Sequence, residues 1–368
     1  MAVTRPFRLS LALHFLISAL FLPVSPPPQA QSAPIAANPI LPGPKPADAP
    51  SEWKGILGIY GSGKDALILL ERDQKLHLSD EKETRPTLPL EGNGRLKHSA
   101  DSIELNDCLS ILTENGGKTA YLLSCLNSRQ PLPRTDAGSD PAQFYHVTPA
   151  RPLKELREKA LASSPPGEVG PFRKPDLVEL ATLDAAIHLD IRYASARNFL
   201  STPVYTEARA FLQRPAAEAL LRVLHKVQPL GYGLLIHDAY RPWYVTKIFW
   251  DATPPEGKIF VADPQKGSKH NRGCAVDLTL YDLATGHAIE MPGLYDEMSP
   301  RSFPNFPGGT SLQRWHRDLL RRAMESEGFT VNEDEWWHFD YKDWKQYGVL
   351  NVPFEKIAVS QQPTAVSH

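Results

Sequence analysis

Two short segments in the second half of the chain carry side chains that metal-dependent hydrolysis uses. The segment SKHNRGCAVD contains His270 and Asp277, and the segment EWWH contains Glu335 and His338. A catalytic zinc ion takes three protein ligands and keeps a fourth position for water, and two histidines with one aspartate supply that set. We therefore predict one zinc ion per chain, bound by His270, Asp277 and His338.

Glu335 is suited to a different role. It precedes His338 by three positions, so its carboxylate can lie beside the metal's water without binding the metal, which is the place for a general base. Two residues three apart on a regular strand point to opposite faces. The role as base therefore requires a bend or a strand end at Trp336–Trp337.

Three more side chains near these segments have competing interpretations. Arg241 directly follows a predicted strand and could stabilise the oxyanion of a substrate carbonyl, or it could form a structural salt bridge. His237, beside Asp238, is a minor rival ligand. Cys274 could be mistaken for a zinc ligand, although a small buried filler is the expected role. A single histidine is more often structural than a ligand, so the prediction rests on the two segments together.

The elements that must position these residues alternate irregularly along the chain. Mixed strands and helices predict an α+β fold with a central, mostly antiparallel sheet flanked by helices. The strand patterns cover residues 184–193, 232–238 and 274–280, and the helix patterns cover residues 214–228 and a segment from Ser311, its predicted cap, to Gly328.

Changes in composition divide the chain into six parts. Proline-rich stretches mark the linkers, and short apolar runs between turn signals indicate a small β-rich domain before the candidate site. The predicted parts are a signal peptide (1–32), a Pro-rich linker (33–50), a β-rich accessory domain of unknown ligand (51–150), a helix and linker (151–171), the domain with the candidate site (172–357) and a tail (358–368).

The first residues predict export to the periplasm or the outside of the cell. Arg5 and Arg8 precede an apolar run from Leu9 to Leu22, and cleavage is expected near Ser32. The run is shorter than the roughly 20 residues of a membrane-spanning helix, so we expect no stable membrane insertion after cleavage. An uncleaved membrane anchor is the alternative.

Cysteines and charge add two further expectations. In an exported protein, Cys108 and Cys125 can form one disulfide within the accessory domain. The 40 basic and 42 acidic residues give a formal net charge of -2. Nearly equal numbers of basic and acidic residues give no strong excess of positive charge for binding nucleic acid, so we predict no nucleic-acid partner.

The candidate segments together resemble the zinc D-alanyl-D-alanine metallopeptidases, most closely the VanX-type D-alanyl-D-alanine dipeptidases. The resemblance covers the C-terminal half of the chain. It lies in the pattern SxHxxGxAxD continuing into LTLYDLATG, in EWWH, and in YGLL followed by DAYRP. It implies zinc-dependent hydrolysis of the D-Ala-D-Ala dipeptide.

The resemblance also assigns residues. It implies zinc ligation by the two histidines and the aspartate, base catalysis by Glu335 and transition-state stabilisation by Arg241. It further implies that Asp296, in YDEM, receives the free amino group of the substrate, and that Ser268 contacts the substrate in the pocket. A carboxylate beyond the metal would select substrates with a nearby ammonium group.

Some features depart from the family pattern and leave the exact substrate open. These are Lys269 beside the ligand His270, His237 where an aromatic residue precedes the aspartate, and the accessory domain. The nearest alternative is a D,D- or L,D-carboxypeptidase that trims peptidoglycan stem peptides with the same zinc chemistry. A non-catalytic cell-wall binding protein is a third hypothesis, and its structural metal site would have a fourth protein ligand.

Overall fold

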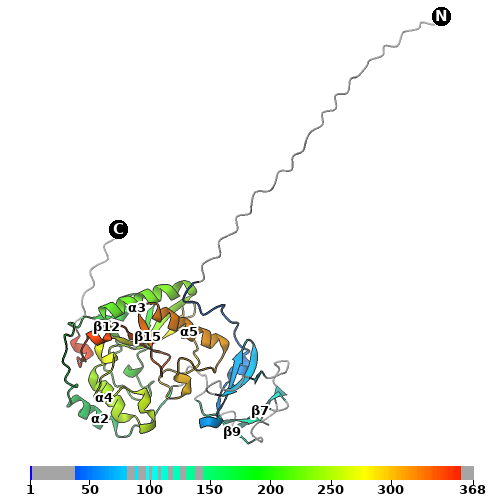
Figure 1. Cartoon of the computed structure of the whole chain (residues 1–368), viewed down its shortest axis with the longest axis horizontal. Coiled ribbons are helices and arrows are strands. Elements are labelled where there is room, and N and C mark those ends of the chain that lie inside the picture. Colours follow the sequence, from blue (N-terminus) through cyan, green and yellow to red (C-terminus); the bar gives the residue numbers. More distant parts are fainter. Residues whose placement is uncertain are drawn as a thin grey trace. The chain divides into compact units, whose positions relative to one another are not determined.

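The computed structural model describes Met1, residues 38–80, 130–136 and 144–357, and the short strands between residues 88 and 124, with side chains only for residues 109–112 and 120–123 of these strands. A five-stranded sheet organises the C-terminal part (Figure 1). β11 runs parallel to β13, and the other neighbouring pairs are antiparallel. The predicted α+β class with a mostly antiparallel sheet is confirmed. In spatial order the strands are β11 (Ile187–Leu189), β13 (Tyr232–Asp238), β14 (Ala275–Asp282), β16 (His338–Tyr341) and β15 (Phe329–Val331).

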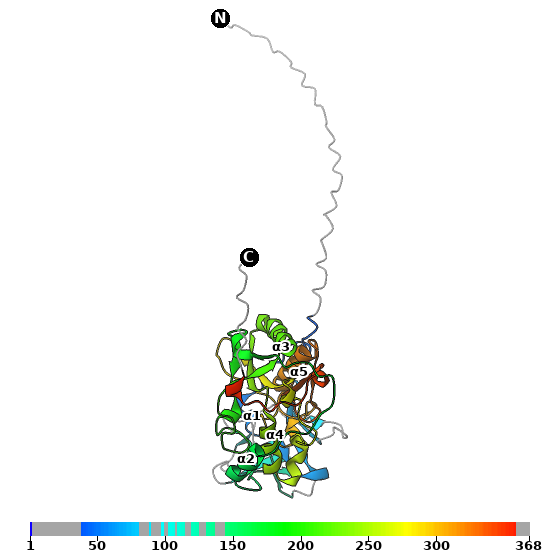
Figure 2. The same cartoon turned by 90° about the vertical axis from the view of Figure 1, so that its left-hand side faces the viewer.

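Four helices accompany this sheet. In both Figures 1 and 2, α3 and α5 lie together at the top, whereas α2 and α4 lie together at the bottom. A two-stranded antiparallel ribbon adds to this part of the chain. The helices are α2 (Leu153–Leu161), α3 (Arg214–Val227), α4 (Trp243–Ala252) and α5 (Ser311–Glu325), and the ribbon strands are β10 (Leu177–Glu179) and β12 (Phe211–Gln213).

The ends of α3 and α5 follow from local sequence. Pro215 lies in the first turn of α3, where a missing N–H costs nothing, and Gly231 takes φ +89° where the chain turns toward β13. The sequence predicted Ser311 as the N-cap of α5, but the N-cap is Thr310, one residue earlier. Thr310 accepts a hydrogen bond from the Gln313 backbone, and the Gln313 side chain accepts one from the Thr310 backbone, so the pair forms a capping box.

The described strands of the N-terminal part are antiparallel throughout and form two sheets, β1–β2–β3–β4 and β5–β6–β7–β8–β9. Buried apolar side chains such as Trp53, Leu69 and Ile111 pack between them. The elements are α1 (Ser51–Lys54), β1 (Gly58–Tyr60), β2 (Leu67–Arg72), β3 (Lys75–Asp80), β4 (Leu88–Pro89), β5 (Lys97–His98), β6 (Ser102–Asn106), β7 (Leu109–Glu114), β8 (Thr119–Ser124) and β9 (Leu132–Pro133).

Several sequence predictions fall on residues that the structure does not describe. The predicted signal peptide, the first residues of the linker, the tail and the cysteine pair Cys108 and Cys125 lie outside the described residues. Within the described part of the chain, no helix has both the length and the apolar character needed to cross a membrane.

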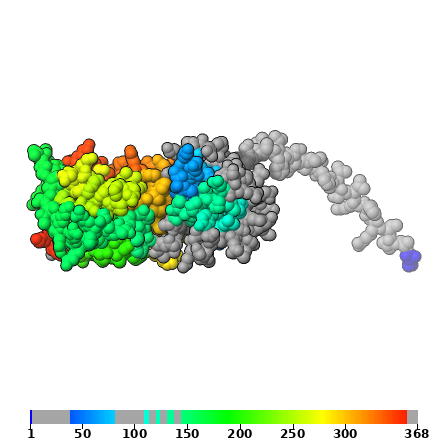
Figure 3. Space-filling view, turned by 90° about the horizontal axis from the view of Figure 1, so that it is seen from below, coloured from blue at the N-terminus to red at the C-terminus, as the bar shows by residue number. Residues whose placement is uncertain are grey.

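The chain before α1 packs against the C-terminal part. Ile40 is 2% exposed and belongs to the main hydrophobic core. Trp315 Nε1 donates to the Gly43 carbonyl at 3.0 Å, and Lys45 Nζ donates to the Tyr232 hydroxyl at 2.7 Å. In Figure 3 the blue surface of the N-terminal strands lies next to the orange surface of the segment that precedes α5. Residues 40–45 are therefore held along the core.

Candidate active site

Adjacent elements bring the three predicted metal ligands together. His270 lies in a single 3-10 turn (His270–Arg272) before β14, Asp277 lies in β14, and His338 is the first residue of β16. The antiparallel register pairs Asp277 directly with His338. Gly273 joins the turn to the strand at φ +66°, and a Cβ there would lie 2.6 Å from Leu177 Cδ2, so both conformation and space favour glycine.

The donor atoms of these ligands form a nearly regular triangle. His270 Nε2, Asp277 Oδ1 and His338 Nδ1 lie 3.1 to 3.2 Å from one another. A tetrahedral zinc ion with bonds of about 2.0 to 2.1 Å separates neighbouring ligand atoms by roughly 3.3 Å. Asp277 Oδ1 is buried without a hydrogen-bond donor among the described residues. The triangle therefore fits a small cation.

Hydrogen bonds on the outer side of each ligand fix its orientation. His270 Nδ1 lies 2.6 Å from the Ala239 carbonyl, and His338 Nε2 lies 2.9 Å from Asp340 Oδ1. If each of these nitrogens donates its proton outward, the other nitrogen of each ring presents a lone pair to the centre of the triangle. Lys269 Nζ, 2.9 Å from Asp340 Oδ2, balances the charge of that carboxylate.

The electrostatics of the triangle favour a positive charge. Burial lowers the pKa of His338, but the nearby carboxylates of Asp340 and Asp277 outweigh it and raise that pKa to about 10. Burial raises the pKa of Asp277, but the two histidines outweigh it and hold that pKa well below its usual range. Both shifts stabilise a cation between these side chains, which a metal ion would provide.

Glu335 lies beside this triangle because the chain turns just before β16. Trp336 and Trp337 form a turn, and β16 begins at His338, so the predicted bend is present. Glu335 Oε2 lies 3.5 Å from His338 Nδ1 and accepts a hydrogen bond from Asn332 Nδ2 at 3.2 Å. Burial raises the pKa of the Glu335 carboxyl to about 7.

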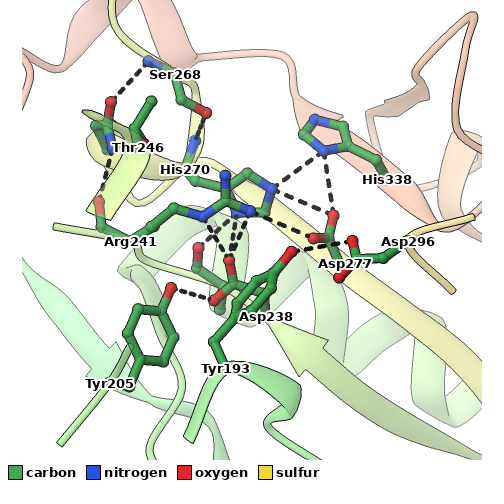
Figure 4. A network of polar contacts seen from close by, with 12 residues as sticks. Tyr193, Tyr205, Asp238, Arg241, Thr246, Ser268, His270, Asp277, Asp296 and His338 are labelled. Carbon is green, nitrogen blue, oxygen red and sulfur yellow. Dashed lines mark hydrogen bonds and ion pairs between the residues drawn. The ribbon is translucent and has the colours of Figure 1, made fainter. Parts of the chain in front are cut away.

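Arg241 reaches the site from the segment between β13 and α4. Its guanidinium contacts Asp238 Oδ2 through both Nε and an Nη atom at 2.8 Å, and it lies 3.7 Å from Asp277 Oδ2 (Figure 4). Tyr205 donates to the other oxygen of Asp238 at 2.7 Å. The alternative salt bridge is thus present, and it fixes the guanidinium at the edge of the metal site.

Asp296 and Ser268 line the same pocket, whose volume is about 240 Å³. Asp296 Oδ1 accepts a hydrogen bond from Tyr193 at 3.0 Å, whereas Oδ2 is buried with no partner among the described residues. Burial and the charges of Asp277 and Glu335 raise the pKa of Asp296 well above its ordinary value. Among the described residues, this buried carboxyl group therefore has no cation in hydrogen-bond contact.

The two rival ligands lie outside the triangle. His237 Nδ1 contacts the Asp190 carbonyl at 3.3 Å, and its ring packs at a tilt against Tyr295, with 4.6 Å between the ring centroids. Cys274 is fully buried in the main core, and burial raises the pKa of its thiol to about 12, so it acts as the expected apolar filler. Among the described residues, the group of potential metal ligands contains only His270, Asp277 and His338.

Three residues that sequence reasoning missed support the site. Asp340 orients His338, the Tyr295 hydroxyl donates to Asp277 Oδ2 at 3.1 Å, and Tyr193 holds Asp296. A signal for Asp340 was present, because residues two apart on a strand share a face and His338 begins one. Tyr193 lies 103 positions before its partner, so no local pattern connects the two.

The site offers the donor set of a metal-dependent hydrolase. A family model described as D-ala-D-ala dipeptidase matches residues 173–360, which is about half of the chain. The chain belongs to this D-ala-D-ala dipeptidase family, and it is a peptidase. All five ligand and catalytic positions predicted from the sequence lie within the matched segment.

Curated relatives agree with the family. A D-alanyl-D-alanine dipeptidase of Escherichia coli is 35% identical over 179 residues, covering 49% of this chain and 91% of the relative. The enzymes of the same name from Enterococcus faecalis and Streptomyces coelicolor are 34% and 32% identical, covering 44% and 46% of this chain and 90% and 92% of the relatives. The similarity thus spans nearly whole relatives but only part of this chain.

Proposed function

We propose that this protein hydrolyses the D-Ala-D-Ala dipeptide in a zinc-dependent reaction with Glu335 as general base. One observation carries the proposal. Three donor atoms 3.1 to 3.2 Å apart line a pocket of about 240 Å³ together with Glu335 and Asp296, and Asp296 Oδ2 is buried there with no hydrogen-bond partner among the described residues. The relatives' printed name supports the dipeptide as substrate.

Zinc fits the donor set of two imidazoles and one carboxylate. When bound, a zinc ion would polarise the scissile carbonyl and acidify a water molecule. Three ligands among the described residues leave a coordination position open, which supports a catalytic site over a structural one with four protein ligands. One ion per chain is expected.

Glu335 is placed to move the proton. With a pKa of about 7, the carboxylate can accept a proton from the attacking water and later give it to the leaving amine at neutral pH. Asn332 donates to Glu335 Oε2 and holds that oxygen toward the pocket.

Arg241 is the proposed stabiliser of the oxyanion. Asp238 holds the guanidinium at two points, and the rings of Tyr193 and Phe249 lie 5.4 and 4.9 Å from its centre. These contacts keep the donor fixed before the negative charge develops on the substrate carbonyl, so little reorganisation is needed.

Asp296 is the proposed receptor for the substrate's ammonium group. Its free oxygen is buried in the pocket, and a cation there would relieve the cost of burying the carboxylate. Ser268, 5% exposed, lines the same pocket and is the proposed second substrate contact. A peptide whose amino group is acylated would leave the Asp296 carboxylate without its charge partner.

Export to the periplasm or beyond is also part of the proposal, and the sequence of residues 1–32 supports it. The accessory region 51–150 and the Cys108–Cys125 disulfide stay predictions from the sequence. A periplasmic or secreted enzyme would encounter peptides released from the cell wall.

The direct test is release of D-alanine from D-Ala-D-Ala by the purified chain, with and without a chelator. Glu335→Gln keeps the size of the side chain and removes the base. We expect at least a hundredfold lower kcat with unchanged zinc content, because general-base catalysis contributes about 10²- to 10⁴-fold. Glu333→Gln, the same change at an exposed residue two positions earlier, is the matched control.

Two outcomes would contradict the proposal. Cleavage that survives complete removal of the metal would exclude the metal-dependent reaction. Preference for N-acetyl-D-Ala-D-Ala over the free dipeptide would contradict the role of Asp296 and favour a carboxypeptidase acting on stem peptides.

A further inference from the structure

The segment that carries Asp296 has a strained backbone. Asp296 adopts φ +59°, a left-handed conformation that is uncommon for residues other than glycine. Such a conformation persists only where the surroundings hold it in place. Residues 291–299 form neither a helix nor a strand, so side-chain contacts must supply the support.

Two buried charged residues on the same segment provide part of that support. Glu297 accepts hydrogen bonds from the Leu294 backbone at 2.9 Å and from the Ser299 hydroxyl at 2.7 Å. Arg301 Nε donates to the Pro292 carbonyl at 3.0 Å and lies 3.6 Å from Glu297 Oε2. Arg301 therefore bridges the two sides of the segment around Asp296.

The N-terminal part of the chain supplies the next partner. Asp136 Oδ1 lies 3.3 Å from an Nη atom of Arg301, and the Asp136 side chain is completely buried. Asp136 is held in its own region, because it accepts hydrogen bonds from Arg134 Nε at 2.9 Å and from the Ile59 backbone. Arg301 is 4% exposed and Glu297 1%. Water cannot replace these contacts, so losing one partner leaves a buried charge poorly compensated.

The same N-terminal part also holds the chain that follows this segment, just before α5. Glu71 accepts hydrogen bonds from the backbone and hydroxyl of Ser311, the first residue of α5. Phe306 packs against Ile68 and Leu70 of β2. Contacts from the N-terminal part thus secure the chain between Asp296 and α5 at more than one place.

The segment is also tied to the proposed base. The Ser302 carbonyl accepts a hydrogen bond from the Trp336 backbone at 2.7 Å, and Trp336 directly follows Glu335. The Glu335 side chain itself is held by Asn332, which lies outside the segment, so loosening of the clamp should act mainly on Asp296.

We propose that Asp136, Arg301 and Glu297 form a clamp by which the N-terminal part of the chain positions Asp296 for the substrate's ammonium group. The clamp rests on the proposed function of Asp296 and names Arg301 as its positioning residue. Asp136 lies outside residues 173–360, the segment that the family model matches. The N-terminal part thus tunes substrate recognition through an internal contact, separate from any ligand of its own.

The test compares the full-length chain with its Asp136→Asn variant, which keeps the shape of the side chain and removes its charge. We expect KM for D-Ala-D-Ala to rise about tenfold with kcat within about twofold, because loss of a positioned charge weakens binding of the ammonium. Preference for the free dipeptide over its N-acetyl form should fall by a similar factor. Amide hydrogen exchange in residues 292–303 should become faster, whereas exchange in α3 should not change.

Two further variants make the test specific. Asp65→Asn removes an exposed carboxylate from the same part of the chain and should behave as the wild type in every measurement. Arg301→Lys keeps the positive charge but cannot contact Asp136 and the Pro292 carbonyl together, so it should reproduce the Asp136→Asn effect. If either variant is unfolded, faster exchange throughout α3 will reveal it, and the other variant then decides.

The clamp would be overturned if both Asp136→Asn and Arg301→Lys showed the same KM as the wild type and the same rate of amide hydrogen exchange in residues 292–303. A fall in kcat with unchanged KM would also overturn it, because the effect would not act through binding of the ammonium. If the wild type does not cleave the dipeptide while exchange in residues 292–303 still accelerates in the variants, the proposed substrate is wrong and the structural clamp stands.

Discussion

At the scale of single residues, hydrogen bonds on the outer side hold the predicted metal ligands in place. Asp340 accepts a hydrogen bond from His338 Nε2 at 2.9 Å and is paired with Lys269 at 2.9 Å. This contact selects the tautomer in which Nδ1 of His338 faces the metal position. Lys269, which departs from the family pattern, thereby acquires a structural explanation.

This arrangement predicts the effect of Asp340→Asn on metal binding. An amide accepts the His338 proton less strongly than a carboxylate and makes the ring a weaker ligand. We expect zinc affinity to fall about 10- to 100-fold, which competition with a chromogenic chelator would measure. Asp343→Asn, three positions along the chain, is the matched control. Equal affinities for the two variants would show that Asp340 has no influence on the ligand.

At the scale of elements, the register between β14 and β16 places Asp277 directly opposite His338. A one-residue slip of that register would move one ligand to the other face of the sheet. β14 is buried along almost its whole length, so packing on both faces fixes the register. The candidate metal site is therefore a consequence of how the centre of the sheet packs.

Helix α5 carries a buried histidine whose protonation should affect stability. His316 Nε2 lies 2.9 Å from the Tyr232 hydroxyl, which also accepts a hydrogen bond from Lys45. Burial, reinforced by the charge of Lys45, lowers the pKa of His316 to about 4. The hydroxyl thus donates its proton to a neutral imidazole, and a protonated ring could not accept it.

The sign of the pH effect follows from this shift. In the unfolded chain His316 titrates near 6.5, so its contribution to stability is complete above that pH, declines as the pH falls and is lost near pH 4. The difference in unfolding free energy between wild type and His316→Gln should narrow by on the order of 2 to 3 kcal/mol between pH 7 and pH 4. Urea denaturation across this range measures it.

A control for this prediction is available on α3. His225 is exposed, and His225→Gln should leave the pH profile of stability parallel to that of the wild type. A His316→Gln profile that also stays parallel to the wild type would contradict the proposed state of the buried ring.

At the scale of the whole molecule, the N-terminal part of the chain is joined to the core of the C-terminal part. Ile40 fills a position in the main core, and Glu71, Phe306 and Asp136 take part in contacts between the two. These contacts bury apolar and charged groups together, so the two parts should resist unfolding cooperatively.

Ile40→Ala tests that joining. Removing a fully buried isoleucine leaves a cavity and should cost about 2 to 4 kcal/mol of unfolding free energy, measured by guanidinium denaturation. Leu161→Ala, at a side chain that is 57% exposed, should change stability by less than about 0.5 kcal/mol. A loss at Ile40 no larger than that at Leu161 would mean that residues before α1 do not stabilise the core.

The sequence by itself indicated which residues gather at the candidate site. His270, Asp277, Glu335 and His338 lie in two short segments, and the structure brings the three predicted ligands together and shows the predicted bend between Glu335 and His338. The α+β class followed from the mixed order of periodic patterns. These features depend on neighbours along the chain, where hydrophobic period and turn chemistry act directly.

Only the tertiary structure decided the contacts that link distant segments. The bonds of Tyr193 to Asp296, of Arg301 to Asp136 and of Glu71 to Ser311 join residues more than 100 positions apart. No periodic pattern encodes such pairs, because they form only when the fold brings segments far apart in the sequence into contact. For the same reason, the sequence patterns indicated two separate regions. The structure shows buried contacts between them, such as that of Arg301 with Asp136.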